Sequence, residues 1–169
     1  DPQPDLFTNR FAGLAAGLGQ LTLSGALATP EFGLRQRLIA VVTDAPLTPS
    51  LLPTDLAAVA CGDCARPCLA ACPSHAFGDV AVTLNCEDRT AVFQPRDARR
   101  CDWVKRYALM GESGFRYLGS ALDIAAPDMP TADDLAAALR QHDPIKKYRP
   151  VVAEPCVLAC PLAGGVSEK

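Results

Sequence analysis

Eight cysteines are the residues of this chain whose type and spacing carry a recognisable chemistry. Four of them lie within CGDCARPCLAACP at residues 61–73, which has the pattern C-x2-C-x3-C-x3-C-P. A second C-x3-C-P stands in CVLACP at residues 156–161. Close runs of cysteine hold [4Fe-4S] clusters, and a cysteine followed by proline at the end of such a run often ligates a second cluster. The spacing therefore predicts iron–sulfur chemistry, with thiolates shared between the two motifs.

The number of cysteines matches two [4Fe-4S] clusters with four thiolates each. We expect each cluster to take ligands from both motifs, which we call the crossed arrangement. The expected ligands of the first cluster are then Cys61, Cys64, Cys68 and Cys160. The expected ligands of the second cluster are Cys72 and Cys156, together with the two cysteines that remain, Cys86 and Cys101.

Zinc and disulfides are the alternatives for the same side chains. Structural zinc sites made of four cysteines generally use two short-spaced pairs, whereas this chain has one C-x2-C followed at once by two more cysteines. Disulfide scaffolds are typical of small exported chains without a core, and this chain has 169 residues of which 49% are hydrophobic. Both alternatives are weaker than two clusters.

Composition excludes two classes of partner. The net charge of −3 gives no general attraction for nucleic acid. Charged residues interrupt the richest apolar stretch, so no window reaches the roughly 20 apolar residues of a spanning helix. We therefore expect no nucleic-acid partner and no transmembrane segment.

A small set of elements is expected to position the cysteines. The predicted elements are a helix at 6–19, a buried strand at 37–44, a short strand at 81–85, a helix at 96–111 and a helix at 130–142. In the last of these, Thr131 is expected to cap the helix and Asp134 to complete a capping box. The proline-rich stretch after the strand is expected to separate two parts of the chain.

These motifs, taken in order, resemble one protein family. The stretch AGLGQLTLSGALATPEFGLRQRLIAVVTDAPL at 16–47, then CGDCARPCLAACPSHAF, DARRCDWV and CVLACP, resembles the C-terminal half of the epoxyqueuosine reductase and reductive dehalogenase superfamily. The resemblance implies an α+β fold, with a ferredoxin-like domain holding two [4Fe-4S] clusters at 51–169. It implies that residues 1–50 are a remnant of a nitroreductase-like α/β cobalamin domain. Family members carry one more cysteine near the end, where this chain has Ala153, and Cys86 is expected to replace it.

The same resemblance suggests a corrinoid contact in the N-terminal part. The residues that it places near a corrinoid or substrate, held partly by another chain, are Gly17, Gly19, Ser24, Gly25, Arg35 and Arg37. The alternative is that the glycines form turns and the arginines are solvated. A catalytic acid is not assigned, because in the family it lies in a part of the cobalamin domain that precedes residue 12.

The predicted function is electron transfer, with two [4Fe-4S] clusters passing low-potential electrons to a corrinoid-dependent or related reductase centre. The expected partner is a redox protein, a cobalamin-domain subunit or a second copy of the chain. One alternative is a corrinoid-dependent reductase whose pocket is completed by another chain; others are a zinc-bound interaction module and a cluster-based redox sensor. Thiolates must stay reduced until they are loaded, which favours the cytoplasm, although related dehalogenases are often exported to the periplasm afterwards.

Overall fold

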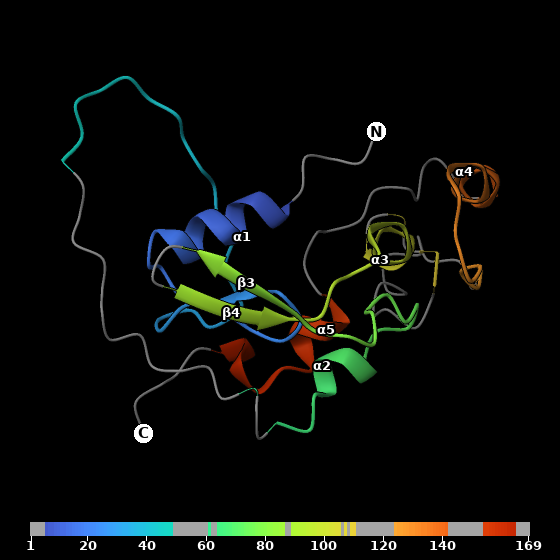
Figure 1. The fold of residues 1–169 in the computed structure, drawn as a ribbon. Helices are drawn as coiled ribbons and strands as arrows, with labels where there is room; N and C mark the ends of the chain where they lie inside the picture. The colour runs from blue at the N-terminus through green and yellow to red at the C-terminus, as the bar shows by residue number, and fades with distance from the viewer. Residues whose placement is uncertain are drawn as a thin grey trace. The chain divides into compact units, whose positions relative to one another are not determined.

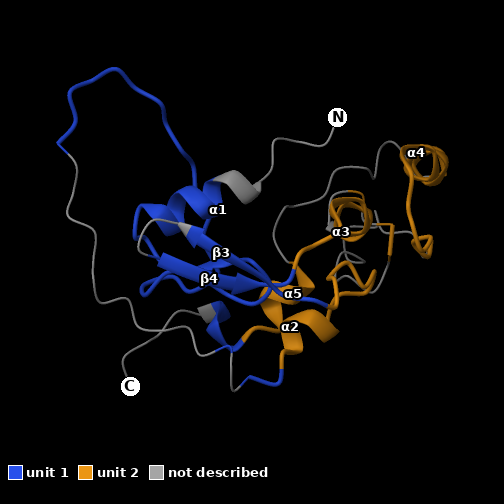
Figure 2. Ribbon diagram, viewed as in Figure 1, with its two compact units in different colours: residues 1–65, 80–94, 161–169 blue, residues 66–79, 95–160 orange. Residues whose placement is uncertain are grey.

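The computed structural model describes residues 6–48, 61, 64–86, 89–105, 107, 109–110, 124–141 and 154–164 (Figure 1). The chain divides into two compact units (Figure 2). Unit 1 consists of residues 1–65, 80–94 and 161–169, and unit 2 consists of residues 66–79 and 95–160. Helices and two small antiparallel sheets make up the described elements, which confirms the α+β class.

Unit 1 begins with helix α1, Leu6–Ala15, which confirms the first predicted helix. The helix ends in a Schellman motif: Leu18 N–H donates to the Gly13 carbonyl at 2.9 Å, and Gly17 N–H donates to the Leu14 carbonyl at 3.0 Å. Gly17 has a φ of 67°, which is the left-handed conformation that this motif requires. The glycine therefore stops the helix and turns the chain toward the first strand.

Two short hairpins complete unit 1. Strand β1, Gln20–Leu21, pairs antiparallel with β2, Leu27–Ala28, and β3, Val82–Cys86, pairs antiparallel with β4, Arg89–Phe93. Gln94 N–H donates to the Leu23 carbonyl at 2.8 Å and joins the hairpins. The strand predicted at 81–85 is confirmed as β3.

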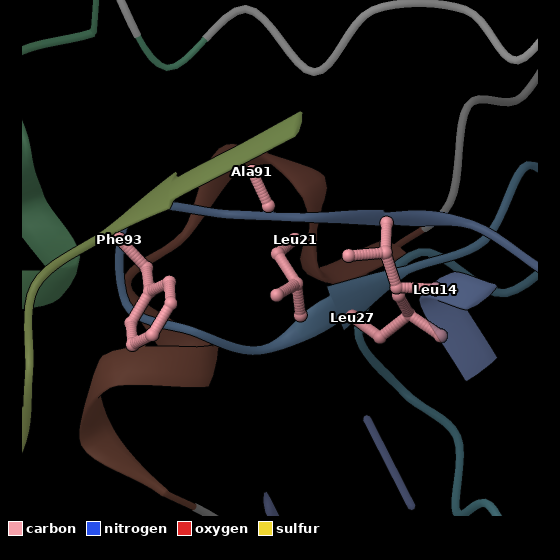
Figure 3. Close-up of a cluster of buried hydrophobic side chains, with 5 residues drawn as sticks. All are labelled: Leu14, Leu21, Leu27, Ala91 and Phe93. Carbon is pink, nitrogen blue, oxygen red and sulfur yellow. The ribbon is translucent and has the colours of Figure 1, made fainter. Parts of the chain in front are cut away.

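The core of unit 1 lies between helix α1 and the strands. Figure 3 shows its five buried side chains, which are Leu14, Leu21, Leu27, Ala91 and Phe93. Two of them belong to β4, where buried and exposed residues alternate as expected of a strand with one face on a core. Burial of these apolar groups stabilises the pairing of two hairpins that would be marginal in isolation.

The buried strand predicted at 37–44 is wrong. These residues are extended without strand pairing, and Ile39, Val41 and Val42 are 86%, 78% and 99% exposed. Leu38 alone packs against the core of unit 1. An apolar, β-branched run becomes a strand only where a neighbouring strand satisfies its backbone, and no described strand pairs with this run. We call residues 39–47 the exposed apolar segment.

Unit 2 contains four helices in its described part. They are α2, Pro67–Ala70; α3, Ala98–Lys105; α4, Ala132–Arg140; and α5, Pro155–Leu158. Trp103, Leu109 and Ala138 form its buried core. The Trp103 indole Nε1 donates to the Ile124 carbonyl at 2.8 Å, so its only polar atom is satisfied in the interior.

Two predicted helices lie in unit 2. Helix α3 ends at Lys105, earlier than the predicted end near residue 111, although Trp103 and Leu109 are buried. Helix α4 is confirmed, including its capping box between Thr131 and Asp134. In the predicted apolar stripe, Ala138 is buried, and Leu135 and Leu139 are partly buried.

Two further expectations from the sequence concern a transmembrane segment and a domain boundary. Within the described ranges, no helix is long and apolar enough to cross a membrane. The boundary predicted between residues 50 and 51 falls outside the described residues, which stop at 48 and resume at 61.

Candidate metal centre

The two C-x3-C-P motifs form matching one-turn helices. Helix α2 starts at Pro67 and helix α5 at Pro155, and in both the proline occupies the first turn, where its missing N–H leaves no orphan donor. The N–H of Ala71 donates to Pro67, and the N–H of Ala159 donates to Pro155, each at 2.9 Å. The two helices pack against each other within unit 2. The sequence echo is therefore a structural repeat.

Each repeat carries a cysteine just after its first proline and another just after its last alanine. Cys68 of α2 thus corresponds to Cys156 of α5, and Cys72 corresponds to Cys160. The amides of Cys72 and Cys160 each donate to the carbonyl three residues back, at 3.3 and 3.2 Å. The two predicted ligand sets are related by the same correspondence. If each cysteine is replaced by its counterpart in the other repeat, Cys68 and Cys160 of the first set become Cys156 and Cys72 of the second.

A pocket in unit 2 is lined by three thiols. Cys72, Cys101 and Cys156 come from the end of α2, from α3 and from α5. The pocket has about 330 Å³ of space free of protein atoms, part of it open to solvent. Its other lining residues are Pro73, Phe77, Arg96, Val104, Glu154 and Pro155. Four of these six residues are apolar, and the three cysteines are partly buried.

Helix α3 places Cys101 in its first turn. Asp97 caps the helix, since its carboxylate accepts from the N–H of Arg100 at 2.9 Å. Arg100 and Ser74 then bond reciprocally: the Ser74 hydroxyl donates to the Arg100 carbonyl at 2.7 Å, and Arg100 Nη1 donates to the Ser74 carbonyl at 2.8 Å. This pair fastens the turn after Cys72 to the helix that carries Cys101.

The sulfur of Cys72 accepts a backbone hydrogen bond. Ala76 N–H donates to Cys72 Sγ at 3.4 Å, and the Ser74 hydroxyl lies 3.7 Å from the same sulfur. In unit 1, Leu23 N–H donates to Cys61 Sγ at 3.4 Å. Bonds of this kind to a sulfur tune the potential of a cluster that the sulfur binds.

Burial is the main electrostatic influence on Cys156. It raises the pKa of this thiol to about 12, with smaller contributions in the same direction from Glu154 and from the sulfurs of Cys101 and Cys72. Arg96 acts in the opposite direction. A thiol in this position stays protonated at neutral pH unless a metal displaces the proton, because a coordinated thiol is deprotonated.

The other predicted metal ligands are distributed over both units. Cys61 and Cys64 belong to unit 1, where Cys64 N–H donates to the Cys61 carbonyl at 3.4 Å. Cys86 ends strand β3, also in unit 1, with Arg89 as its register partner. Cys68 and Cys160 belong to unit 2 and are both buried.

The glycines of the predicted corrinoid contact have structural roles in unit 1. Gly17 ends α1, and a Cβ on Gly19 would lie 2.1 Å from the Ala28 carbonyl oxygen, so β2 can approach only a glycine here. Gly25 has a φ of 71° in the turn between β1 and β2. These roles correspond to the alternative stated for the glycines, and the corrinoid contact stays a prediction.

The remaining candidates for a corrinoid contact are one serine and two arginines. Ser24 is buried, with its hydroxyl 3.1 Å from that of Thr22. Arg35 and Arg37 are exposed. Ser24 therefore faces the interior of unit 1.

The cysteines that the structure describes are all free thiols. Seven cysteines have described side chains, and the structure gives them as thiols instead of disulfides. Among the described residues, no three His, Cys, Asp or Glu side chains converge closely enough for a single metal ion. In a cubane each thiolate binds a different iron, so the ligands surround the cluster instead of meeting at one point. Three thiols around one apolar pocket have that arrangement.

Sequence reasoning identified the three thiols of the pocket and missed their neighbours. Arg96 and Glu154 line the pocket without belonging to any cysteine motif, although Glu154 stands beside the position of the missing cysteine. Asp97 could have been found as a helix cap from its place before the helical run. No protein-family model, curated protein or solved structure matches this chain.

Proposed function

We propose that this chain is an iron–sulfur electron-transfer protein with a ferredoxin-like arrangement of two [4Fe-4S] clusters. The observation that carries the proposal is the pocket of unit 2, where Cys72, Cys101 and Cys156 line one largely apolar wall. Three different elements deliver these thiols to one place. A [4Fe-4S] cluster accepts and releases one electron at a time.

The residues of the pocket suit such a cluster in three respects. Ala76 N–H, 3.4 Å from Cys72 Sγ, supplies the hydrogen bond that stabilises a thiolate. Arg96 brings a positive charge that partly opposes the rise in the pKa of Cys156. Phe77 and Val104 supply apolar surface that limits the access of water.

The correspondence between α2 and α5 extends the proposal to a second cluster. Cys72 corresponds to Cys160 in the other repeat, and Cys156 corresponds to Cys68. Both counterparts, Cys160 and Cys68, are buried. We therefore assign Cys68 and Cys160 to the first cluster, together with Cys61 and Cys64 of the same motif. Leu23 N–H, which donates to Cys61 Sγ, has the role there that Ala76 N–H has at Cys72.

The acceptor that we propose is a corrinoid-dependent or related reductase centre. This part of the proposal depends on the resemblance to the epoxyqueuosine reductase and reductive dehalogenase superfamily. The acceptor would be held by a cobalamin-domain subunit or in a pocket completed by a second copy of the chain. Cobalamin that co-purifies with the isolated chain would support the alternative, in which this chain is part of the reductase itself.

The decisive experiment measures iron, acid-labile sulfide and zinc in protein purified without oxygen. We expect about eight iron and eight sulfide per chain, with visible absorption that bleaches on reduction. A Cys101→Ser variant should lose the cluster of unit 2, whereas Thr43→Ala, which alters an exposed hydroxyl, serves as the matched control. Zinc without sulfide would overturn the proposal.

A further inference from the structure

The pocket of unit 2 contains a fourth donor that is not a cysteine. Besides its three thiols, the lining includes the carboxylate residue Glu154. Of the other lining residues, four are apolar and one is Arg96, which cannot give up its proton to bind a metal. The pocket therefore has three sulfur donors and one oxygen donor, which is the number of ligands that a cubane takes.

The backbone places Glu154 beside Cys156 at the start of helix α5. Glu154 is the N-cap residue, with φ −80° and ψ 123°, and its side chain does not cap the helix. Pro155 follows and fixes the backbone between the two side chains. The carboxylate is close enough to Cys156 to contribute to the raised pKa of that thiol. The side chain is thus near the sulfurs.

The cysteine expected to be the eighth ligand lies elsewhere in the chain. Cys86 is at the end of β3, whereas the three thiols and Glu154 all line one pocket. A ligand set drawn from the lining of this pocket needs a fourth donor besides the three thiols. Glu154 completes such a set, and it immediately follows Ala153, where the resemblance led us to expect a cysteine.

We propose that Glu154 is the fourth ligand of the cluster held by Cys72, Cys101 and Cys156. This inference rests on the proposed function, because it assigns a ligand to one of the two proposed clusters. A carboxylate is a harder donor than a thiolate and holds iron less firmly in a sulfur-rich site. One iron of this cluster is therefore bound more weakly than the other three.

This difference can be measured by mild oxidation with ferricyanide. Ferricyanide removes one electron from the [4Fe-4S]²⁺ cluster, one Fe²⁺ leaves to solution, and a [3Fe-4S]⁺ cluster with all four sulfides remains. We expect the wild-type protein to release one iron per chain and to develop the electron paramagnetic resonance signal of a three-iron cluster. The cluster with four thiolates should stay intact under the same treatment.

Two variants test the assignment. Glu154→Cys supplies a thiolate at the same position, so it should retain all its iron under ferricyanide and give no three-iron signal. Cys86→Ser should behave as wild type in iron content and in spectrum. The ligand assignment is overturned if Glu154→Cys releases iron as wild type does, or if Cys86→Ser loses a cluster.

The failure of this inference differs from the failure of the proposed function. If the wild-type protein holds about eight iron and eight sulfide but Cys86→Ser holds about half, two clusters exist and only the fourth ligand is misassigned. If the wild-type protein holds zinc and no sulfide, the proposed function fails and the ligand assignment fails with it.

Discussion

Replacing Ser74 by alanine removes one of the two hydrogen bonds that fasten the turn after Cys72 to the helix carrying Cys101. The Ser74 hydroxyl, on a side chain that is 3% exposed, donates to the Arg100 carbonyl at 2.7 Å. A neutral hydrogen bond contributes about 1 kcal/mol, and a buried acceptor left without a donor raises the loss to about 1–3 kcal/mol. We expect Ser74→Ala to lower the free energy of unfolding by that amount.

Trp103 provides the assay for this loss. It is the only tryptophan of the chain and is buried in the core of unit 2, so its fluorescence reports the unfolding of that unit. With a urea m-value of about 2 kcal/mol/M, the loss corresponds to a midpoint lowered by about 0.5–1.5 M. The titration is carried out without oxygen to preserve bound metal.

Thr43→Ala is the control for the Ser74 variant. The Thr43 hydroxyl accepts from Ala45 N–H at 3.0 Å on the exposed surface, and removing it should change stability by less than about 0.5 kcal/mol. The reasoning is refuted if the midpoints of Ser74→Ala and Thr43→Ala coincide. In that case the Ser74 bond would not be holding the turn to helix α3.

Three other perturbations have defined outcomes. Gly19→Ala should destabilise unit 1 by about 1–3 kcal/mol in urea titrations followed by circular dichroism, because its Cβ would lie 2.1 Å from the Ala28 carbonyl oxygen; an unchanged midpoint would contradict that contact. Thr131→Ala should destabilise helix α4 by about 0.5–2 kcal/mol. Hydrogen bonds from Thr131 lower the pKa of Asp134 from 3.8. The capping box is therefore fully present above pH 3.8 and is lost as the pH falls through the lowered pKa. Over the same pH range, the difference in helicity between wild type and Thr131→Ala should shrink. Elastase, which cleaves after small aliphatic residues, should cut first in the exposed apolar segment, near Val42. Mass spectrometry of the fragments identifies the first cut, and a first cut in another described region would contradict this prediction.

Local signals in the sequence were sufficient where a few neighbouring residues decide the structure. The capping box of Thr131 and Asp134 fixes the start of α4, and both partners lie within one turn. Gly17 ends α1 for an equally local reason. The strand at 37–44 failed because a strand depends on a partner elsewhere, and neither β-branched content nor apolar character reveals whether one exists.

In the candidate metal centre, too, the sequence revealed what a motif encodes and missed what depends on residues far apart in the chain. Counting the cysteines grouped Cys72, Cys101 and Cys156 with Cys86, and the structure places the first three in the lining of one pocket. Glu154 was missed because a single acidic residue forms no motif, and only the three-dimensional pocket places it among the sulfurs. The pairing of Ser74 with Arg100 spans 26 residues and has no signature in the sequence.

The pocket joins parts of the chain that are synthesised far apart. Cys72 and Cys156 are separated by 84 positions, so whatever binds both acts as a cross-link that closes most of unit 2 into a loop. In the chain-entropy model, a covalent link over a loop of that length restricts the unfolded chain by about 4–5 kcal/mol. The loop can close only after Cys156 has been synthesised. If a cluster binds these cysteines, its removal lifts this restriction, so unit 2 should unfold at a lower urea concentration without it.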